Sequence, residues 1–424
     1  MQFMLSARCA VAAGAGVVLA LASAVAGYAA PAVGTVRVSE AADGTQANAN
    51  STSPDITPDG RFVVFGSNAT NLVAADTNGV GDLFVRDLKT GAIDLVTHGA
   101  DGSPANGGSI GPRISADGRF VTFWSSASNL AAGDTNGVDD VFVRDRQTGS
   151  TTRLPSGLDF SAFPDINSTG RYVAYSTRSA LLRTDFDILS DIYLWDRSTE
   201  AVTLLVTGGN GENSSPVLSA NGRWVAFMSD STDLTKDAVA SGNNSFVLDR
   251  TTGAITLVSR ASDGTPASAG SYPQGISDNG RYIVFSSSAD NLVTGDANGD
   301  TDVFLYDRVT GRTVAASSTP DGRTGDAASY DPDISPDGGY VSYFSLAQNL
   351  TGAVLPEWEI HTYLYDRKAG TNTVVSVPPA GAGGGGWASA VSSGGRFVAY
   401  ESFGDGLVKG DTNDEMDVFI TQLY

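Results

Sequence analysis

A unit that recurs seven times limits the fold of this chain more than any other feature. Each complete copy contains a short strand, a tight turn around glycine, an aromatic-rich strand, a polar loop, a third strand and a fourth strand. The turn glycines are Gly60, Gly118, Gly170, Gly222, Gly280, Gly338 and Gly395. Four strand signals at a period of 52 to 58 residues are typical of propeller blades. The sequence therefore predicts an all-β fold, a seven-bladed β-propeller of four-stranded antiparallel blades.

The two ends of the chain predict how such a ring closes. The last copy stops at its third strand, in residues 417–424, and residues 34–39 match the fourth strand of the first copy. An N-terminal strand that completes the last blade would remove the exposed edges of an open sheet. The predicted blades of a single domain, residues 33–424, are 53–99, 110–155, 162–208, 214–260, 271–317, 329–378 and 387–424 with 34–40.

Residues 1–32 differ in composition from the repeats. Arg8 is the only charged residue before Arg37, and residues 9–27 are almost entirely Ala, Val, Leu and Gly. A charged start, an apolar middle and small residues near the end predict a signal peptide, with an uncleaved membrane anchor as the alternative. We expect cleavage, no stable membrane insertion afterwards, and a protein that is secreted or held in the periplasm or cell envelope.

Charge limits the partners of the chain. It has 26 basic and 47 acidic residues, a formal net charge of −21. Nucleic acid and anionic lipid are poor partners for such a surface, whereas cations, cationic proteins and neutral sugars stay open. The only cysteine, Cys9, lies in the predicted signal, so we expect no internal disulfide and a fold that depends on its core.

The repeat resembles that of a known family. Residues 53–65 read Ser-Pro-Asp-Ile-Thr-Pro-Asp-Gly-Arg-Phe-Val-Val-Phe and residues 82–87 read Asp-Leu-Phe-Val-Arg-Asp, which resembles the WD-like repeat of TolB-type propellers. Residues 331–338 repeat the same pattern. The resemblance implies a propeller over the whole mature chain. TolB itself has six blades behind an additional domain, so the resemblance implies the fold and not the role of TolB.

The loop between the second and third strands is the best candidate for a metal site. Asp or Asn recurs there at positions 1, 3 and 7 in five blades, and Ca²⁺ prefers several oxygen ligands at about 2.3–2.6 Å. The candidate ligands are Asp76, Asn78, Asp82, Asp134, Asn136, Asp140, Asp185, Asp187, Asp191, Asp296, Asn298, Asp302, Asp411, Asn413 and Asp417. The alternative is that these side chains cap the turn by bonding backbone amides.

Polar connectors between blades are expected on the same face as these acidic loops. Asp-Gly pairs open long segments rich in Ser, Ala and Asn ahead of several blades, for example at residues 43–44 and 101–102. Loops on a rigid scaffold commonly carry binding contacts. The sequence thus predicts a polar, negatively charged face as the contact surface.

Charged residues on the innermost strands are candidates to line the central channel. Asp55, Asp165 and Asp333 occupy equivalent positions in three blades, and Arg113 occupies that position in a fourth. Paired carboxylates there would suit glycoside cleavage, and solvated groups in a wet channel are the alternative. Trp124, Trp358 and Trp387 would serve as sugar platforms if they lie beside these acids.

Other sequence signals for an enzyme are weak. The two histidines, His98 and His361, fall in different blades, too few for a His-rich metal centre. Residues 107–111 match G-x-S-x-G, but in a connector without the strand-turn-helix that exposes a nucleophile. We assign no catalytic residue, and whether the protein is an enzyme stays open.

The leading hypothesis is a secreted, monomeric propeller that binds a protein or carbohydrate partner through its acidic loop face, with Ca²⁺ as the one candidate cofactor. The first alternative is a carbohydrate-active lyase or glycoside hydrolase that uses the channel carboxylates. The second alternative is a purely structural scaffold of the cell envelope.

Overall fold

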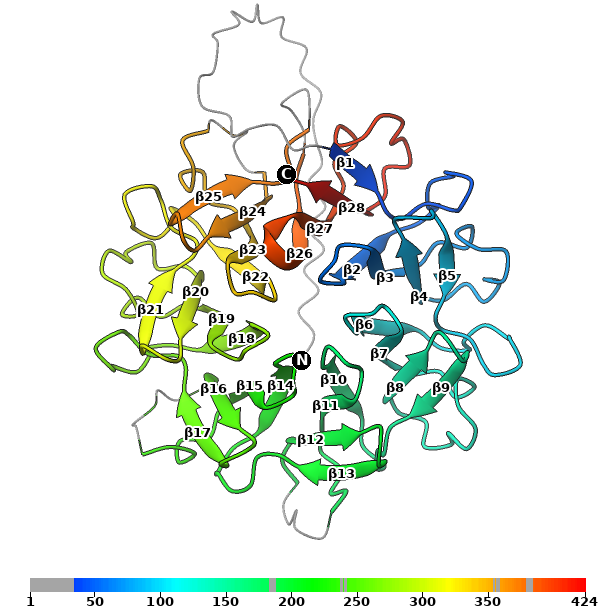
Figure 1. Cartoon of the computed structure of the whole chain (residues 1–424), viewed down its shortest axis with the longest axis horizontal. Coiled ribbons are helices and arrows are strands. Elements are labelled where there is room, and N and C mark those ends of the chain that lie inside the picture. The colour runs from blue at the N-terminus through cyan, green and yellow to red at the C-terminus, as the bar shows by residue number, and fades with distance from the viewer. Residues whose placement is uncertain are drawn as a thin grey trace, which may run out of the picture.

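The computed structural model describes residues 34–182, 188–236, 239, 242–353, 355, 359–378 and 384–424. In these residues, 28 strands form seven four-stranded sheets, and every paired strand is antiparallel to its neighbour. Figure 1 shows the sheets arranged as blades around a central axis. The predicted all-β, seven-bladed propeller is therefore confirmed. The predicted signal, residues 1–32, lies outside the described residues.

Each blade runs from an innermost to an outermost strand. Blades 1 to 3 contain β2 (Ser51–Ile56), β3 (Phe62–Ser67), β4 (Asp82–Asp87), β5 (Ile93–Leu95), β6 (Ser109–Ile114), β7 (Phe120–Ser125), β8 (Asp140–Asp145), β9 (Ser150–Arg153), β10 (Ser161–Ile166), β11 (Tyr172–Thr177), β12 (Asp191–Asp196) and β13 (Ala201–Leu204). Blades 4 and 5 contain β14 (Asn213–Leu218), β15 (Trp224–Ser229), β16 (Asn244–Asp249), β17 (Ala254–Leu257), β18 (Ser271–Ile276), β19 (Tyr282–Ser287), β20 (Asp302–Asp307) and β21 (Arg312–Ala315). Blades 6 and 7 contain β22 (Ser329–Ile334), β23 (Tyr340–Ser345), β24 (His361–Asp366), β25 (Thr371–Val374), β26 (Trp387–Val391), the 3₁₀ turn η1 (Ser393–Gly395), β27 (Phe397–Ser402), β28 (Asp417–Gln422) and β1 (Gly34–Arg37).

The ring closes with strands from both ends of the described chain. β1 pairs antiparallel with β28, from Gly34 opposite Gln422 to Arg37 opposite Phe419. The sheet order is β1-β28-β27-β26, so β1 is the outermost strand of blade 7, as Figure 1 shows. The pairing covers a strand edge that would otherwise be open. The predicted N-terminal closing strand is confirmed.

The core lies between adjacent blades and depends on the aromatic second and third strands. In blade 1, Phe65 and Phe84 are fully buried, with ring centroids 5.9 Å apart. The equivalent stacked pairs recur in other blades at 5.6 to 5.7 Å, for example Phe123 with Phe142 and Phe285 with Phe304. Such pairs add to the free energy gained by burying the rings. This packing explains why each repeat carries an aromatic-rich strand.

The face of the ring that carries the tight turns, residues 58–61 and their equivalents, is named the turn face. Gly118 of blade 2, with φ of +71°, lies on the ring of Phe62 from blade 1, and a Cβ there would be 2.3 Å from the ring. Arg61 lies over the same ring at 4.5 Å, and Arg146 at 5.1 Å. The contact recurs where Gly170 meets Phe120 in the next pair of blades. The repeated glycine is therefore required by inter-blade packing as well as by its backbone conformation.

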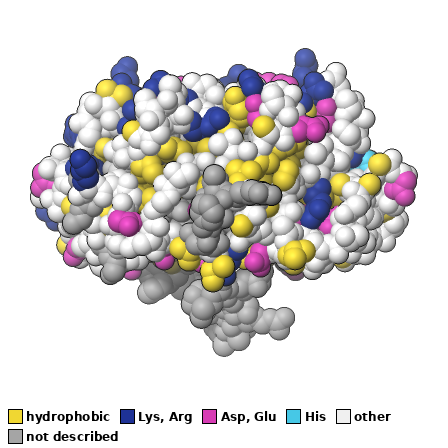
Figure 2. All heavy atoms as spheres, turned by 90° about the horizontal axis from the view of Figure 1, so that it is seen from below, with side chains coloured by type: hydrophobic (Ala, Val, Ile, Leu, Met, Phe, Trp, Pro, Cys, Tyr) yellow, Lys and Arg dark blue, Asp and Glu magenta, His cyan; other side chains and the backbone are white. Residues whose placement is uncertain are grey.

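The turn face also carries cross-strand pairs of arginine and aspartate. Arg61 donates to both oxygens of Asp87, at 3.2 and 2.8 Å. This guanidinium is the main cause that lowers the pKa of Asp87 to about 2, and Arg119 does the same to Asp145. Figure 2, an edge-on view of the ring, shows Lys and Arg side chains gathered mainly along one rim.

The opposite face is named the loop face: it carries the connectors between blades, such as residues 40–50, and the loops between second and third strands, such as 68–81. The two kinds of segment are bonded together, because Asn71 Nδ2 donates to the carbonyl of Gln46 at 2.9 Å and Asn48 Nδ2 donates to Thr70 at 3.1 Å. Connectors and acidic loops thus share one face. Across the part of the chain that the structure describes, helices long and apolar enough to cross a membrane are absent.

Candidate functional site

The innermost strands of all seven blades line one pocket in the central channel, here named the channel pocket. Its volume is about 320 Å³. The lining residues include Ser53, Pro54, Gly111, Pro112, Arg113, Trp124, Phe163, Pro164, Asp165, Ser215, Pro216, Pro273, Gln274, Asp331, Pro332, Asp333 and Ser389. Because these residues occupy equivalent repeat positions, the differences between blades decide the chemistry of the pocket.

A bulge in each innermost strand shapes this lining. In β2 the pairing with β3 shifts register between Thr52 and Asp55, and the other six innermost strands shift at or near the same place. Ser53, just before Pro54, has φ of 54°, and Asp331, just before Pro332, has φ of 48°. Proline lacks an N–H, so it fits a bulge where no ladder bond is made. The X-Pro step thus fits the break in the ladder in blades 1 to 6, whereas blade 7 has the same shift without a proline.

Three of the four predicted channel residues are aspartates that follow these prolines, and each joins two blades. Asp55 Oδ2 accepts from the Ile114 N–H at 2.8 Å, and Asp333 Oδ2 accepts from the Val391 N–H at 2.8 Å. Asp165 makes the same bond at 2.6 Å to Leu218, the equivalent residue of blade 4. One carboxylate oxygen of each is therefore committed to the fold, a role that the sequence did not reveal.

Burial raises the pKa of all three carboxyl groups. The pKa of Asp333 rises to about 7 and that of Asp165 to about 6. The pKa of Asp55 is also raised by burial, and the nearby charge of Arg113 opposes the rise. The positive charge near these carboxylates is thus too small to offset the cost of burying them in the ionised form.

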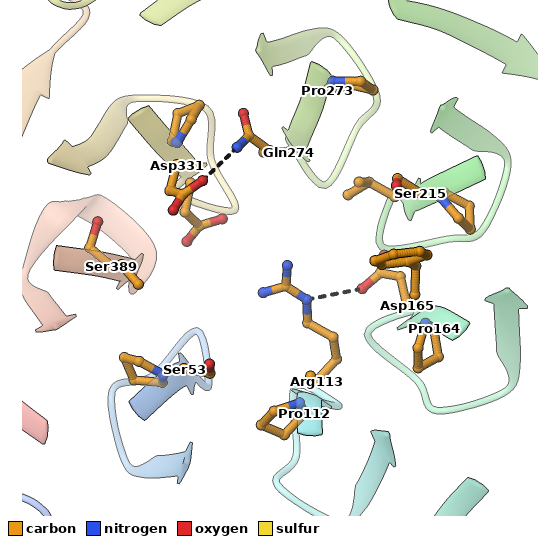
Figure 3. Close-up of a pocket in the computed structure, with 18 of the residues that line it drawn as sticks. Ser53, Pro112, Arg113, Pro164, Asp165, Ser215, Pro273, Gln274, Asp331 and Ser389 are labelled. Atoms are coloured by element: carbon orange, nitrogen blue, oxygen red, sulfur yellow. Dashed lines mark hydrogen bonds and ion pairs between the residues drawn. The ribbon is translucent and has the colours of Figure 1, made fainter. Parts of the chain in front are cut away.

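Arg113 is the only basic residue among those that line the channel pocket. Its Nε lies 4.0 Å from Asp165 Oδ1, and 43 % of its side chain stays exposed inside the channel. Figure 3 shows it reaching from blade 2 toward Asp165, with Asp331 and Gln274 on the other side of the pocket. The guanidinium interacts with Asp55, Asp165 and two acids of blade 6, so it partly compensates several carboxylates at once.

Two further acids, which the sequence did not single out, lie at or beside the pocket. Asp331 accepts from Gln274 Nε2 at 3.0 Å, and Glu401 accepts from the Ser53 N–H at 2.8 Å. Burial raises the pKa of Glu401 to about 7, and the charge of Asp331 contributes. A glutamate in an otherwise apolar second strand was the available signal for Glu401.

Aromatic side chains stand around the loop-face end of the channel. Trp124 lines the pocket and packs on Phe163, with ring centroids 5.6 Å apart and Phe163 49 % exposed. In blade 7, Trp387 meets Phe403 edge-on at 5.7 Å. Trp124 and Trp387 are both only partly buried, and Trp358 lies outside the described residues. The channel pocket therefore combines acids with an aromatic rim.

The acidic loops use part of the predicted metal-ligand set for internal bonds. In blade 1, Asn78 Nδ2 donates to Asp82 Oδ2 at 2.7 Å and to the connector carbonyl of Ala105 at 2.9 Å. Thr97 Oγ1 donates to the other Asp82 oxygen at 2.5 Å. Asn136, Asn298 and Asn413 make the same pair of bonds in their blades. The asparagine and the last aspartate thus tie the loop to the next connector.

The remaining candidates differ among blades. Within the described ranges, no three Asp, Glu, His or Cys side chains converge as a metal site. Asp185 and Asp187 lie outside the described residues, and Asp191 begins β12. Calcium binding in five loops stays a prediction.

The two histidines are not among the residues that line the channel pocket, and of the G-x-S-x-G segment only Gly111 lines it. His361 is buried at the start of β24, which lowers its pKa, and His98 Nδ1 lies 2.9 Å from the Gly99 carbonyl in a connector. Ser109 begins β6, is buried, and donates to Ser125 Oγ at 2.9 Å. This serine is thus engaged in the sheet of blade 2.

A scan against protein-family models finds no match to this chain, and a search of curated proteins finds none either.

Solved structures share the fold. An oligogalacturonate lyase in complex with manganese has a TM-score of 0.54 at 13 % identity, covering 92 % of this chain and 93 % of that one. The β-propeller domain of the Trilobed protease from Pyrococcus furiosus has a TM-score of 0.52 at 12 % identity, covering 83 % and 91 %. TolB from Acinetobacter baumannii matches at 20 % identity with a TM-score of 0.41, over 62 % of this chain and about half (53 %) of its own length. The likenesses to the lyase and to the protease domain show the propeller fold.

Proposed function

We propose that this protein is an exported binding protein whose partner docks on the loop face and places a positively charged group in the channel pocket. The observation that carries the proposal is the charge imbalance of that pocket. Asp165, Asp331 and Asp333 line it, Asp55 and Glu401 lie beside it, and Arg113 is its one basic lining residue.

Physical chemistry favours a cationic guest at this place. A cleft with walls of one sign focuses its field and concentrates ligands of the opposite sign. The raised pKa values of Asp165, Asp333 and Glu401 indicate carboxylates that a bound cation would stabilise. The aromatic rim supplies ring faces for an ammonium or guanidinium group. A lysine or arginine side chain of a protein partner meets all three conditions.

Calorimetric titration of the full chain with a lysine tripeptide, at low ionic strength and pH 7.5, tests this proposal. We expect binding that weakens as salt is added, and a loss of about tenfold in affinity for Asp333→Asn. The asparagine oxygen can still accept from the Val391 N–H, so the variant removes charge while keeping the inter-blade bond.

Asp263→Asn is the matched control, because Asp263 is an exposed acid in a connector of the loop face. It should bind the tripeptide as the wild type does. Equal affinities of wild type and Asp333→Asn would show that the tripeptide binds elsewhere, and no binding at all would refute a cationic guest.

A neutral oligosaccharide is the second candidate guest, favoured by the contact between the partly buried Trp124 and the exposed Phe163. Sugar rings pack on aromatic faces, while carboxylates accept hydroxyl hydrogen bonds. In that case cello-oligosaccharide would bind with little salt dependence, and Trp124→Ala would abolish the binding. A carbohydrate-active enzyme would further convert the sugar, which product analysis of the same mixture would reveal.

A further inference from the structure

In blade 2 the two aspartates of the acidic loop share one arginine. Arg153 Nε lies 2.7 Å from Asp140 Oδ2 and 3.7 Å from Asp134 Oδ1. Asp140 is fully buried and Asp134 is 9 % exposed. A buried pair of like charges is therefore held together by a cation that the protein itself provides.

Blade 7 repeats this arrangement with residues from opposite ends of the described chain. Arg37 Nε lies 3.5 Å from Asp417 Oδ2, and its terminal nitrogen lies 3.4 Å from Asp411 Oδ1. Ring closure is what brings Arg37 there, because it lies on β1. Two blades thus place a guanidinium between the first and last aspartate of the loop.

Blade 1 has the aspartates without the arginine. Each of the two arginines lies on the outermost strand of its blade. Arg153 pairs with Phe142 and Arg37 pairs with Phe419, and each phenylalanine comes two residues after the last aspartate of its loop. In blade 1 that position is Leu95, opposite Phe84. A hydrophobic side chain therefore stands where the other two blades have a positive charge.

The first aspartate of the blade 1 loop is correspondingly unsatisfied. Asp76 is 5 % exposed, and both of its carboxylate oxygens are buried. Within the described structure no side chain donates to them, and only the backbone N–H of Asn78 interacts with this carboxylate. Asp76 and Asp82 occupy the loop positions of Asp134 and Asp140, which one guanidinium reaches together in blade 2. Burying a carboxylate without a partner of opposite charge is unfavourable.

We propose that the blade 1 loop binds one Ca²⁺ ion between Asp76 and Asp82, in the place that an arginine takes in blades 2 and 7. The ligands are the two aspartates, whereas Asn78 keeps its bonds to Asp82 and to the connector. Calcium takes six to eight oxygens, so water and carbonyl oxygens complete the shell and the site is weak, about 10⁻⁴–10⁻³ M. This inference does not depend on the channel pocket.

Blade 5 shows what distinguishes blade 1. Its outermost strand has Ala315 at the arginine position, but Asp296 Oδ1 accepts from Thr324 Oγ1 at 3.2 Å. The connector thus supplies a donor for the first aspartate there. Among the described residues, blade 1 thus lacks the arginine and also has no side-chain donor for its first aspartate.

Thermal unfolding of the full chain with 10 mM CaCl₂ and with EDTA tests the site. We expect calcium to raise the Tm of the wild type by about 2 °C, from mass action at the stated affinity and the size of the domain. Asp76→Asn should lose this rise. Leu95→Arg should also lose it, because the new guanidinium fills the place of the ion. Asp134→Asn, whose loop already has Arg153, is the control and should keep the rise.

The reverse substitution sharpens the test. Arg153→Leu should make the stability of blade 2 depend on calcium, so the calcium-induced rise in Tm should exceed that of the wild type. Equilibrium dialysis with radioactive calcium should find one ion per wild-type chain and none on Asp76→Asn, a reading that remains available if Leu95→Arg fails to fold. No bound calcium on the wild type, or an undiminished rise in Asp76→Asn, would overturn the proposal.

Discussion

The two faces of the ring treat the same residue type in opposite ways. On the turn face, aspartates such as Asp87 pair with arginine, and their pKa falls to about 2. For the buried aspartates of the acidic loops and the channel, burial dominates, and the pKa rises to about 6 for Asp82 and about 7 for Asp333. The turn face repeats one set of contacts between blades, whereas the loop face and channel change from blade to blade. The comparison separates the part that builds the ring from the part available for binding.

The largest expected effect is the loss of stability when the packing of the turn face is disrupted. Gly118→Ala should destabilise the protein by about 2–4 kcal/mol, because φ is +71° and the added Cβ would lie 2.3 Å from the ring of Phe62. Gly44→Ala is the matched variant on the loop face, with φ of +86° and nothing within 4 Å of the added Cβ. It should cost about 1 kcal/mol. Urea unfolding measures both, and equal losses would contradict the packing role of the turn glycine.

The next effect concerns the inter-blade bond of the channel. Asp333→Leu leaves the Val391 N–H without its acceptor, whereas Asp333→Asn keeps one. The leucine variant should be less stable than the asparagine variant by about 1–3 kcal/mol in urea unfolding. If both variants unfold at the same urea concentration, the bond contributes nothing to joining blades 6 and 7.

The acids of the turn face and those of the loop face and channel should change the stability of the protein with pH in opposite directions. The folded state holds protons on Asp333, Glu401 and Asp82 that the unfolded chain has released, so stability should fall as pH rises from about 4 to 7. The lowered pKa of Asp87 works the other way: its contribution is present above about pH 4 and is lost toward pH 2. We expect the highest Tm near pH 4–5.

Two variants show which carboxyl groups cause the changes of Tm with pH. Glu401→Gln should flatten the fall between pH 4 and 7, and Asp87→Asn should flatten the fall below pH 4. A Tm that rises steadily from pH 4 to pH 8 in the wild type would show that the channel carboxyls are not buried as described.

The smallest expected effect is on stability at neutral pH after loss of one turn-face ion pair. Asp87→Asn should change the Tm by less than Gly118→Ala does, because Arg61 is 41 % exposed and water screens the pair. The loss should shrink further in 0.5 M NaCl. A loss as large as that of Gly118→Ala would mean that the pair carries inter-blade packing as well as charge.

Much of the fold could be predicted from the repeat, because each of its signals is local. Strand alternation, the glycine turn and the aromatic second strand recur in register, and the unpaired strand at each end predicted the closure between β1 and β28. The positions of the channel residues followed from the same register. Asp331 and Glu401 were missed, since reading for repeated features passes over a residue that occurs in a single blade.

The sequence by itself determined the number of blades, their strands and the excess of acidic residues, because these depend on period and composition. Only the tertiary structure decided what each acid does. Asp333 joins two blades, Asp417 meets an arginine from the other end of the described chain, and Asp76 meets no side-chain partner among the described residues. The physical reason is that burial and neighbouring charge set the state of a carboxyl group, and in a closed ring those neighbours come from other blades.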